Sequence, residues 1–394
     1  MKILIVVDDF INVSNKAGAI MINELALEFV SRGNDVTVLT PSHLIKNQYK
    51  ISIINKIQIV EFRSGKLKNV SKLRRAINEI LLSFKSVFFL KNWFKMNNHD
   101  YIVYYSPSIF FGPLIKYLKN LWDVKSYLIL RDVFPQWAID SGLVKERSII
   151  TYFFKFFEKI NYSSANYIGM MSPNNVSWFK NTFNKINVET LYNWTVYDNI
   201  SKSEIDYKKK LNIENKVVFF YGGNIGHAQD MGNLVRLIIK LKSNTKSHFV
   251  FVGDGDEVEL VLDLKKKHGL TNLTYLKPVN QNIYSQMLSS FDVGLFSLHR
   301  DHQTHNFPGK LFGYMKHSKP VLGSCNIDND LQEIICNNNA GNIFINGDDD
   351  KLYQACLYMI DSKSKRIYMG VNANKLLKEK FSVSNACLEI EKHF

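Results

Sequence analysis

Short apolar runs alternate with amphipathic stretches along the whole chain, and this alternation limits the possible folds more than any other feature. The apolar runs have hydrophobic residues at nearly every position, which is typical of strands that are buried on both faces. They fall into two series, residues 2–7, 35–40, 57–62, 100–105, 126–131 and 166–171, then 216–222, 248–253, 273–276, 292–296, 320–324 and 341–345. Strands that alternate with helices predict right-handed βαβ units, and so an α/β fold with parallel sheets.

Two series of strands in 394 residues predict two doubly wound domains, since a domain typically has ~150 residues. The junction is expected within 185–205, where the chain is polar and weakly periodic. We therefore predict an N-terminal domain over residues 1–190, a C-terminal domain over 191–379 and a closing helix at about 380–394. Ligands of open α/β sheets bind beyond the carboxyl ends of the strands, so we expect the chemistry in a cleft between two such ends.

Composition excludes several classes of protein. Apolar residues make up 46% of the chain, which supports a full core and argues against disorder. The N-terminal run MKILIVVDDF is too short for a signal peptide, and no window reaches the ~20 apolar residues of a membrane span. The four cysteines form no CxxC pair, which predicts free thiols in a reducing cytoplasm.

Basic residues are concentrated in the first half of the chain. Residues 1–190 carry +11 of the net charge of +14, which favours one basic docking surface. The segment 66–95 holds eight Lys and Arg against one acid, with leucines and aromatic residues between them. This pattern is typical of a helix lying on an anionic membrane. A solvated basic helix packed on the sheet and a nucleic-acid patch are the alternatives, although no other nucleic-acid signature is present.

The stretch FPGKLFGYMKHSKPVLG, residues 307–323, carries the strongest sign of a ligand. Pro308 and Gly309 set a corner, and Lys310 stands in the first turn of the helix that follows. A cation is unfavourable there unless it offsets a bound anion such as a diphosphate. We therefore interpret Lys310 as a ligand-binding residue rather than as a surface lysine.

Glycine-rich turns follow two strands of the second series. In YGGNIGHAQDMG, residues 221–232, the backbone either approaches a phosphate at a helix start or only packs the helix on the sheet. Neither the GxGxxG spacing nor a Walker lysine is present. In FVGDGDEVELV, residues 251–261, the acids favour a structural Asx turn at the start of the next helix, because they repel phosphate.

The first half offers two further candidate positions. Arg131 and Asp132 follow the strand SYLIL directly, so Asp132 is expected to face the cleft, with a local Arg–Asp ion pair as the alternative. Gly18 lies between two alanines at the opening of the first helix. Small residues there allow close approach of a substrate or tight helix packing.

Three histidines, His299, His302 and His305, are spaced by three residues. On a helix they would share a face and could bind a metal. The surroundings predict a loop, and no carboxylate or Cys completes a ligand set. We therefore predict that there is no metal site.

Together these residues resemble a glycosyltransferase of the GT-B fold, similar to family 4. The likeness covers nearly the whole chain, from KILIVVDDF through ELALEFVSRGNDVTVLT to YGGNIGHAQD, FVGDGDE and PGKLFGYMKHSKPVL. It implies two Rossmann-like domains, an acceptor site on the first, a nucleotide-sugar site on the second and a closing helix that crosses back. It also implies that no metal or other cofactor is needed, because cations and helix N-termini hold the donor diphosphate.

The resemblance assigns roles residue by residue. The donor side comprises Gly223, Asn224, Gln229, Val279, Asn306, Gly309, Lys310 and Leu311. The acceptor and sugar side comprises Gly18 and Arg131, and the catalytic group comprises Asp132, Lys310 and His305. Asn224 and Gln229 replace or neighbour positions that are usually basic, so Lys310 is expected to carry more of the positive charge.

The chain departs from the family at two positions. Family 4 enzymes usually carry two glutamates with seven residues between them, and here those positions are His305 and Gly313. The lysine between them, Lys310, remains. The donor-sugar contact is therefore expected from His305 or Asn306, and the ribose contact from elsewhere.

NFPGKLFGYM also resembles a subgroup that transfers an N-acetylated 6-deoxyhexosamine, such as N-acetyl-L-fucosamine. The resemblance implies transfer from a UDP-sugar to a lipid-diphosphate-linked saccharide in O-antigen or capsule assembly. The enzyme would lie in the cytoplasm, peripheral at the inner face of the cytoplasmic membrane, with 66–95 at the lipid and no nucleic-acid partner. The alternatives are an NDP-sugar epimerase and a non-catalytic nucleotide-sugar-binding subunit.

Overall fold

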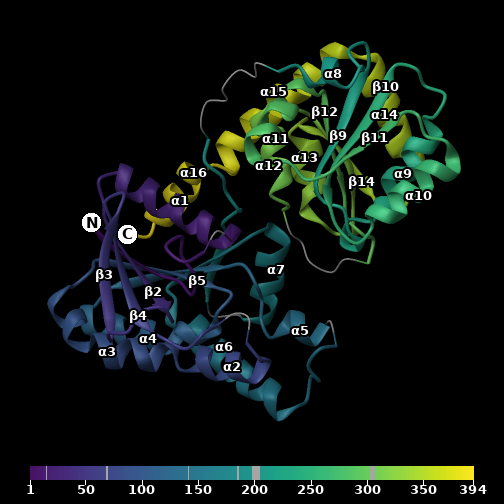
Figure 1. Cartoon of the computed structure of the whole chain (residues 1–394). Coiled ribbons are helices and arrows are strands. Elements are labelled where there is room, and N and C mark those ends of the chain that lie inside the picture. The colour runs from purple at the N-terminus through teal and green to yellow at the C-terminus, as the bar shows by residue number, and fades with distance from the viewer. Residues whose placement is uncertain (15, 68–69, 141, 184–185, 198–204, 302–306) are drawn as a thin grey trace. The chain divides into compact units, whose positions relative to one another are not determined.

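The computed structural model describes the chain except residues 15, 68–69, 141, 184–185, 198–204 and 302–306 (Figure 1). The chain divides into two compact units. The first comprises Met1–Val196 and Val383–Phe394, and the second comprises Tyr197–Ser382. Each unit is an α/β domain with its own sheet, as the alternating sequence pattern predicts.

The first unit is built on an eight-stranded sheet in the order β3-β4-β2-β1-β5-β6-β7-β8. Its strands are β1 (Lys2–Val6), β2 (Asp35–Ser42), β3 (Tyr49–Ile54), β4 (Ile57–Arg63), β5 (Tyr101–Ser106), β6 (Lys125–Leu130), β7 (Tyr167–Met170) and β8 (Asn187–Thr190). Neighbours are parallel except β3 and β4, which are antiparallel. The sequence pattern misses β3 and β8, because an edge strand is less covered than a central one.

The second unit is built on a parallel six-stranded sheet in the order β11-β10-β9-β12-β13-β14. Its strands are β9 (Val217–Asn224), β10 (Ser247–Asp254), β11 (Leu273–Leu276), β12 (Val293–Ser297), β13 (Val321–Cys325) and β14 (Gly341–Ile345). All six coincide with the predicted second series. Each sheet has a topological switch point, between β1 and β5 in the first unit and between β9 and β12 in the second. Ligands of such sheets bind at the carboxyl ends of the strands beside that point.

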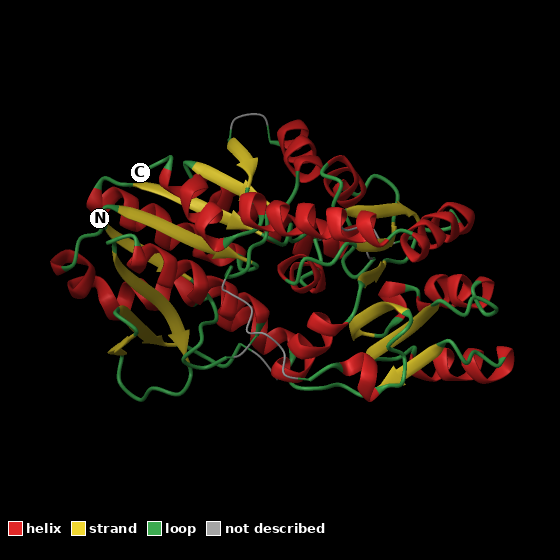
Figure 2. Cartoon of the chain, turned by 90° about the horizontal axis from the view of Figure 1, so that it is seen from above, coloured by secondary structure: helices red, strands yellow, loops and turns green. Residues whose placement is uncertain are grey.

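Helices cover the sheets (Figure 2). The first unit has α1 (Ala17–Ser31), α2 (Lys72–Ile80), α3 (Leu82–Met96), the short 3-10 turn η1 (Ile109–Phe111), α4 (Gly112–Trp122), α5 (Gln136–Asp140), α6 (Ile149–Ser164), α7 (Pro173–Thr182) and α16 (Val383–Glu391). The second has α8 (Tyr207–Lys210), the 3-10 turn η2 (His227–Gln229), α9 (Met231–Lys240), α10 (Val258–His268), α11 (Gln281–Ser290), α12 (Lys310–Lys316), α13 (Asp330–Asn337), α14 (Asp349–Asp361) and α15 (Lys363–Lys380).

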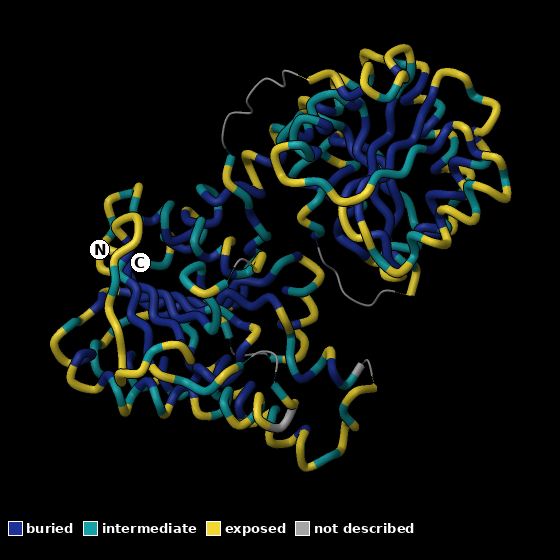
Figure 3. The backbone as a smooth tube through the Cα atoms, in the orientation of Figure 1, coloured by how far each residue is buried: buried dark blue, intermediate teal, exposed yellow. Residues whose placement is uncertain are grey.

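The central strands of each sheet are buried on both faces, which explains their continuous apolar sequence (Figure 3). Along β1, Leu4 and Val6 join one hydrophobic cluster, whereas Ile3 and Ile5 join another. Successive side chains of a strand point to opposite faces, so these two clusters are the cores above and below the first sheet. All four cysteines are free thiols, as predicted.

The observed boundary between the units falls at Val196, where the sequence placed it at residue 190. Leu191 and Trp194 are buried in the core of the first unit, so the boundary lies after them. The second unit ends at Ser382 rather than at 379. Phe381 is fully buried and stacks against Phe307 of the same unit, with ring centroids 4.3 Å apart.

The segment 66–95 forms two helices rather than the single interfacial helix that its composition suggests. α2 ends at Ile80, and α3 begins at Leu82. Leu90, Trp93 and Phe94 of α3 are buried in the core, so one face of this segment packs on the sheet. No helix in the described part of the chain is both long and apolar enough to cross a membrane.

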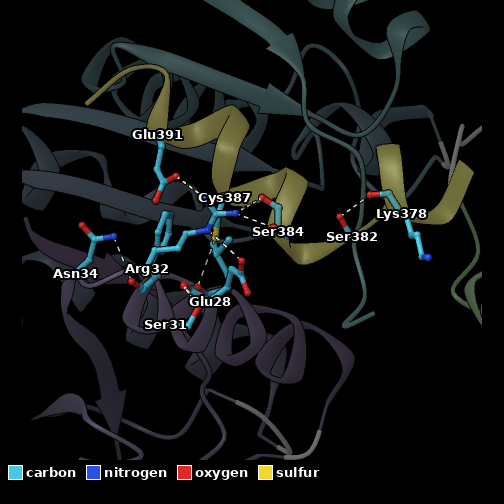
Figure 4. Close-up of polar contacts among 11 residues, drawn as sticks. Glu28, Ser31, Arg32, Asn34, Lys378, Ser382, Ser384, Cys387 and Glu391 are labelled. Atoms are coloured by element: carbon cyan, nitrogen blue, oxygen red, sulfur yellow. Dashed lines mark hydrogen bonds and ion pairs between the residues drawn. The ribbon is translucent and has the colours of Figure 1, made fainter. Parts of the chain in front are cut away.

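Arg32 fastens α16 to α1 within the first unit (Figure 4). Its Nε donates to Glu28 at 3.0 Å, its Nη1 to Glu391 at 3.0 Å and its Nη2 to the Ser384 hydroxyl at 2.7 Å. Its side chain is 23% exposed, so these charge-assisted bonds lie partly out of water. They join the C-terminal segment to a helix more than 350 residues earlier in the chain.

We expect Arg32→Ala to lower the free energy of unfolding by about 1–3 kcal/mol, because it leaves Glu391 and Ser384 without their shared donor. Arg75→Ala is the matched control, since Arg75 is 59% exposed and pairs only with Glu79 of its own helix among the pairs seen here. We expect Arg75→Ala to lower the free energy of unfolding by only about 0–0.5 kcal/mol. Urea denaturation checks both, and equal losses in the two variants would contradict the role of Arg32.

Candidate active site

Lys310 lies at the carboxyl end of β9, beside the switch point of the second sheet. Its Nζ donates to the hydroxyl oxygen of Tyr221 at 2.5 Å and lies 3.9 Å from the centre of the same ring. α12 begins at this residue, and the side chain reaches back over the last residues of β9. The lysine that the sequence singles out is therefore held over a strand end where α/β sheets bind ligands.

Burial lowers the pKa of Lys310 to about 7, well below the ordinary lysine value. A buried ammonium loses its hydration, and an aromatic face and a hydroxyl replace only part of it. A bound anion would restore the charged form and gain a strong, poorly screened interaction. The position therefore suits a cation whose partner is supplied by a ligand.

Three other predicted donor residues gather around Lys310. The Tyr221 hydroxyl donates to the carbonyl oxygen of Asn224 at 2.5 Å, and the Asn224 side-chain amide donates to Gln229 Oε1 at 2.6 Å. Gly223 has a φ of +119°, and a methyl group on it would lie 3.6 Å from Lys310 Cε. The structure thus brings Gly223, Asn224, Gln229 and Lys310 together around Tyr221.

The backbone N–H groups at the start of α9 are not free to bind a phosphate, which was one of the two alternatives for the glycine-rich turn. The Met231 N–H donates to Glu257 Oε2 at 2.8 Å, and the Asn233 N–H donates to Asp230 Oδ1 at 3.2 Å. Two carboxylates therefore already occupy this helix start, which leaves packing as the interpretation of the turn. Any phosphate in this unit is expected at Lys310 instead.

Gly253 sets how closely β9 and β10 approach at this edge. A methyl group at Gly253 would lie 1.8 Å from the carbonyl oxygen of Gly223. The prediction that an Asx turn begins α10 is wrong. Asp254 accepts a hydrogen bond from the Gly255 N–H at 2.9 Å, and α10 begins only after Glu257. These glycines therefore shape the backbone under the ligand position rather than contact a ligand themselves.

We expect Gly253→Ala to force β9 and β10 apart at Gly223, and so to weaken UDP binding at least tenfold and lower the melting temperature. Lys351→Ala is the control, because Lys351 is 68% exposed on α14 of the same unit and is not among the donor-side residues. Calorimetric titration with UDP and a thermal melt measure both effects. A Gly253→Ala protein with unchanged UDP affinity would contradict the role given to this close approach.

The remaining donor positions are less informative. Val279 is half-buried in the loop between β11 and α11, and Gly309 is exposed just before α12. Leu311 is fully buried, so its side chain belongs to the core and only its backbone could meet a donor. His305 and Asn306 lie outside the described residues.

Gly313 faces α11 instead of open space. A methyl group there would lie 3.3 Å from Leu288 Cδ1 and 3.8 Å from Tyr284 Cε1. Tyr284 in turn covers Gly222, because a methyl group on that glycine would lie 2.4 Å from the tyrosine ring. The α11 side chains therefore occupy the region in which a longer residue at 313 would have to fit.

The predicted acceptor-side residues meet at the switch point of the first sheet. Tyr105 lies near the end of β5, and a methyl group at Gly18 would lie 3.3 Å from its hydroxyl oxygen. Burial raises the pKa of Tyr105 to about 12, and the charges of Arg131, Asp132 and Asp8 act on it. Gly18, Arg131 and Asp132 thus surround one buried hydroxyl at the carboxyl edge of the sheet.

Arg131 is held by backbone carbonyl oxygens, and its predicted place on the acceptor and sugar side stays a prediction. Its Nη1 donates to the carbonyl oxygen of Leu191 at 2.7 Å and its Nη2 to that of Tyr192 at 3.2 Å. The residue is 6% exposed, and its guanidinium lies 5.2 Å from the Trp194 ring centre. It therefore ties the end of β6 to the segment after β8 instead of pairing with its neighbour Asp132.

Asp132 is an exposed residue at the same edge. Partial desolvation of its carboxyl raises its pKa above the ordinary value, and the charge of Arg131 opposes this shift. A carboxylate with a raised pKa accepts a proton more readily than an ordinary one. Asp132 is therefore the acid–base candidate of the first unit.

The second unit matches a known family over nearly its whole length. Residues 203–376 match the model described as glycosyl transferases group 1. These residues of the second unit are therefore similar to glycosyl transferases group 1. The matched residues include the switch point of the second sheet and Lys310.

A curated relative and several solved structures share more of the chain. The probable glycosyltransferase WbjE of Pseudomonas aeruginosa is 26% identical over 231 residues, which are 57% of this chain and 56% of that protein. The match therefore spans just over half the length of this relative. It is consistent with the group 1 assignment.

Solved structures show that the fold is GT-B. Anabaena Alr3699/HepE in complex with UDP has a TM-score of 0.69 and 14% identity, over 100% of this chain and 99% of that one. Sucrose-phosphate synthase from Thermosynechococcus elongatus has a TM-score of 0.70 and 13% identity, over 99% and 97%. WaaG, a glycosyltransferase involved in lipopolysaccharide biosynthesis, has a TM-score of 0.63 and 13% identity, over 99% of each chain.

Two tyrosines of the candidate site regions were not predicted from sequence, Tyr221 and Tyr105. Both lie in strands whose residues are mostly apolar, so they read as core side chains. Tyr221 is fully buried and Tyr105 is partly buried, and each lies near the carboxyl end of its strand. That position within a strand is the one sequence signal that could have identified them.

The predicted absence of a metal site concerns residues that are only partly described. His299 lies 4.8 Å from His227 between ring centres, and its Nδ1 is 3.7 Å from Asp301. No group of three or more metal-ligating side chains occurs among the described residues. His302 and His305 lie outside them.

Proposed function

We propose that the protein is a metal-independent glycosyltransferase that moves a sugar from a UDP-sugar to a lipid-linked saccharide. The observation that carries the proposal is the buried Lys310 ammonium over the carboxyl end of β9, among residues similar to glycosyl transferases group 1. Solved structures of the similar Alr3699/HepE contain UDP and UDP-glucose, which supports a uridine nucleotide as the donor.

Lys310 has the charge that the reaction requires. Negative charge develops on the leaving diphosphate as the bond to the sugar breaks, and a fixed cation stabilises it. The Tyr221 hydroxyl accepts from Lys310 and is itself fixed by donating to the Asn224 carbonyl oxygen, so the ammonium needs little reorganisation when the charge appears. We therefore assign Lys310 to leaving-group stabilisation and Asn224 and Gln229 to its support.

We assign Asp132 to the acceptor hydroxyl, either as a hydrogen-bond acceptor or as the group that takes its proton. The raised pKa and the exposed position of the carboxyl support this role. The donor sugar that we propose is an N-acetylated 6-deoxyhexosamine such as N-acetyl-L-fucosamine, in O-antigen or capsule assembly. The similarity to WaaG, a glycosyltransferase involved in lipopolysaccharide biosynthesis, supports a surface-polysaccharide context.

We also propose that the enzyme is peripheral at the inner face of the cytoplasmic membrane, with 66–95 contributing to the contact. The lipid-linked acceptor is embedded there, so the enzyme must reach it. The outward basic residues of α2 and α3 support this location.

Calorimetric titration with UDP, GDP and ADP, with and without EDTA, tests the donor assignment. We expect UDP to bind most tightly and EDTA to change nothing. Transfer from UDP-N-acetylhexosamines to a lipid-linked acceptor then tests the reaction. Binding without transfer from any donor would favour a nucleotide-sugar-binding subunit, and no nucleotide binding would reject the transferase.

A further inference from the structure

We propose that the outward face of α6, together with the junction of α2 and α3, is a membrane-docking surface that inserts apolar side chains into an anionic bilayer. The proposed lipid contact is inferred from exposed side chains of the first unit. Only the role of this contact, access to a lipid-linked acceptor, rests on the proposed function.

α6 packs on its own unit through one side and exposes apolar side chains next to that side. Phe157 packs inward, as expected of a helix that covers a sheet. The outward face carries Ile149, Tyr152, Phe153 and Phe156, whose exposed fractions are 88%, 64%, 40% and 60%. Their spacing of three and four residues places them in one stripe along the helix. The solvent face of a surface helix is normally polar, so a stripe of this kind indicates a partner.

The junction of α2 and α3 adds a second apolar stripe beside the first. Leu81, Phe84 and Phe88 are spaced by three and four residues and are 36%, 58% and 78% exposed. The two helical segments share a small hydrophobic cluster, in which Ile80 packs with Phe157. Figure 1 shows α2 and α6 next to one another along one side of the first unit. The stripes therefore belong to one surface.

Basic residues surround this surface and select the partner. Lys145 and Arg147 precede α6, and Lys155 and Lys159 lie on it, all exposed. Glu146 is the exposed acid among them, since Glu158 is buried. Exposed apolar side chains ringed by cations suit a bilayer with anionic headgroups. A second copy of the same face would bring like charges together, which disfavours a dimer.

The topology places this surface where a membrane substrate is needed. A helix that follows a parallel strand runs back along the sheet, so its N-terminal half lies at the carboxyl edge. The exposed stripes occupy the N-terminal halves of α3 and α6, which follow β4 and β6. Asp132 stands at the same edge of the same sheet. An enzyme docked in this way presents its acceptor-side residues toward the lipid surface.

Vesicle co-sedimentation of the full chain tests the proposal. We expect binding to phosphatidylglycerol–phosphatidylethanolamine vesicles and little binding to pure phosphatidylcholine. Phe153→Ser combined with Phe156→Ser should reduce binding to the anionic vesicles at least about tenfold, because two exposed rings no longer insert. Tyr368→Ser combined with Val371→Ser is the control, since these residues are 52% and 58% exposed on α15 of the other unit.

The readouts separate docking from catalysis. Both variants should keep the wild-type melting temperature and UDP affinity, because the altered residues are exposed and none belongs to the donor site. Equal vesicle binding by wild type and the α6 variant would overturn the proposal, as would a wild-type dimer that the same variant dissociates. Loss of UDP binding in the wild type would instead reject the proposed function and leave the docking surface standing.

Discussion

Replacing Lys310 with methionine is expected to raise the melting temperature of the protein while it removes UDP binding. The ammonium is held in surroundings that lower its pKa to about 7. In the unfolded chain the side chain of Lys310 keeps the ordinary lysine pKa. Below about pH 10, Lys310 therefore binds its proton more strongly in the unfolded chain than in the folded chain. The charged side chain therefore costs folding free energy at pH 7, and each unit of lowered pKa corresponds to about 1.4 kcal/mol.

Methionine keeps the length and the apolar stem of the side chain and removes the charge. We expect the melting temperature at pH 7 to rise by about 2–5 °C, given the size of the second unit. We expect transfer, measured as kcat/KM, to fall about a hundredfold, as when other preorganised charge-stabilising groups are removed. A scanning-calorimetry melt and a transfer assay measure the two effects.

Lys351→Met is the matched control for this exchange. Lys351 lies on α14 of the same unit, is 68% exposed and pairs only weakly through Asp348 at 2.9 Å. Its replacement should change neither the melting temperature nor UDP binding. A Lys310→Met protein that is less stable than wild type and still binds UDP would show that Lys310 is a structural residue.

The strands were predictable because burial on both faces leaves a continuous apolar signature, as in β5 and β9. The edge strands β3 and β8 were not, since partial exposure removes that signature. Lys310 was predictable because a cation in the first turn of a helix needs an anion to justify it. Its partner Tyr221 was not, because a tyrosine inside an apolar strand looks like any core residue.

Other features of the site depend on partners that are distant in the sequence. Arg131 looked available for a sugar, but its partners are the carbonyl oxygens of Leu191 and Tyr192, about 60 residues later. The start of α9 looked open to a phosphate, but Glu257 fills it from the loop after β10. Local spacing carries no information on such contacts, whereas it does place Lys310, Gly223 and Asp132 at strand ends.

UDP binding is expected to weaken steeply as the pH rises above 7. In the free protein Lys310 has a pKa of about 7, and a bound diphosphate should raise it toward the ordinary lysine value. Only the protonated form attracts the diphosphate, so affinity is highest near and below pH 7. Above it, the affinity falls about tenfold per pH unit until the pH reaches the pKa of Lys310 in the complex.

Titration of UDP at pH 7 and pH 9 should therefore show a Kd that increases about fiftyfold. Binding at pH 8 should also take up nearly one proton, which makes the observed heat depend on the ionisation enthalpy of the buffer. The Lys351→Met protein keeps Lys310 and should follow the wild-type profile. A lysine with an ordinary pKa would give the same Kd at both values and no proton uptake, and that result would show that Lys310 is already charged before the donor arrives.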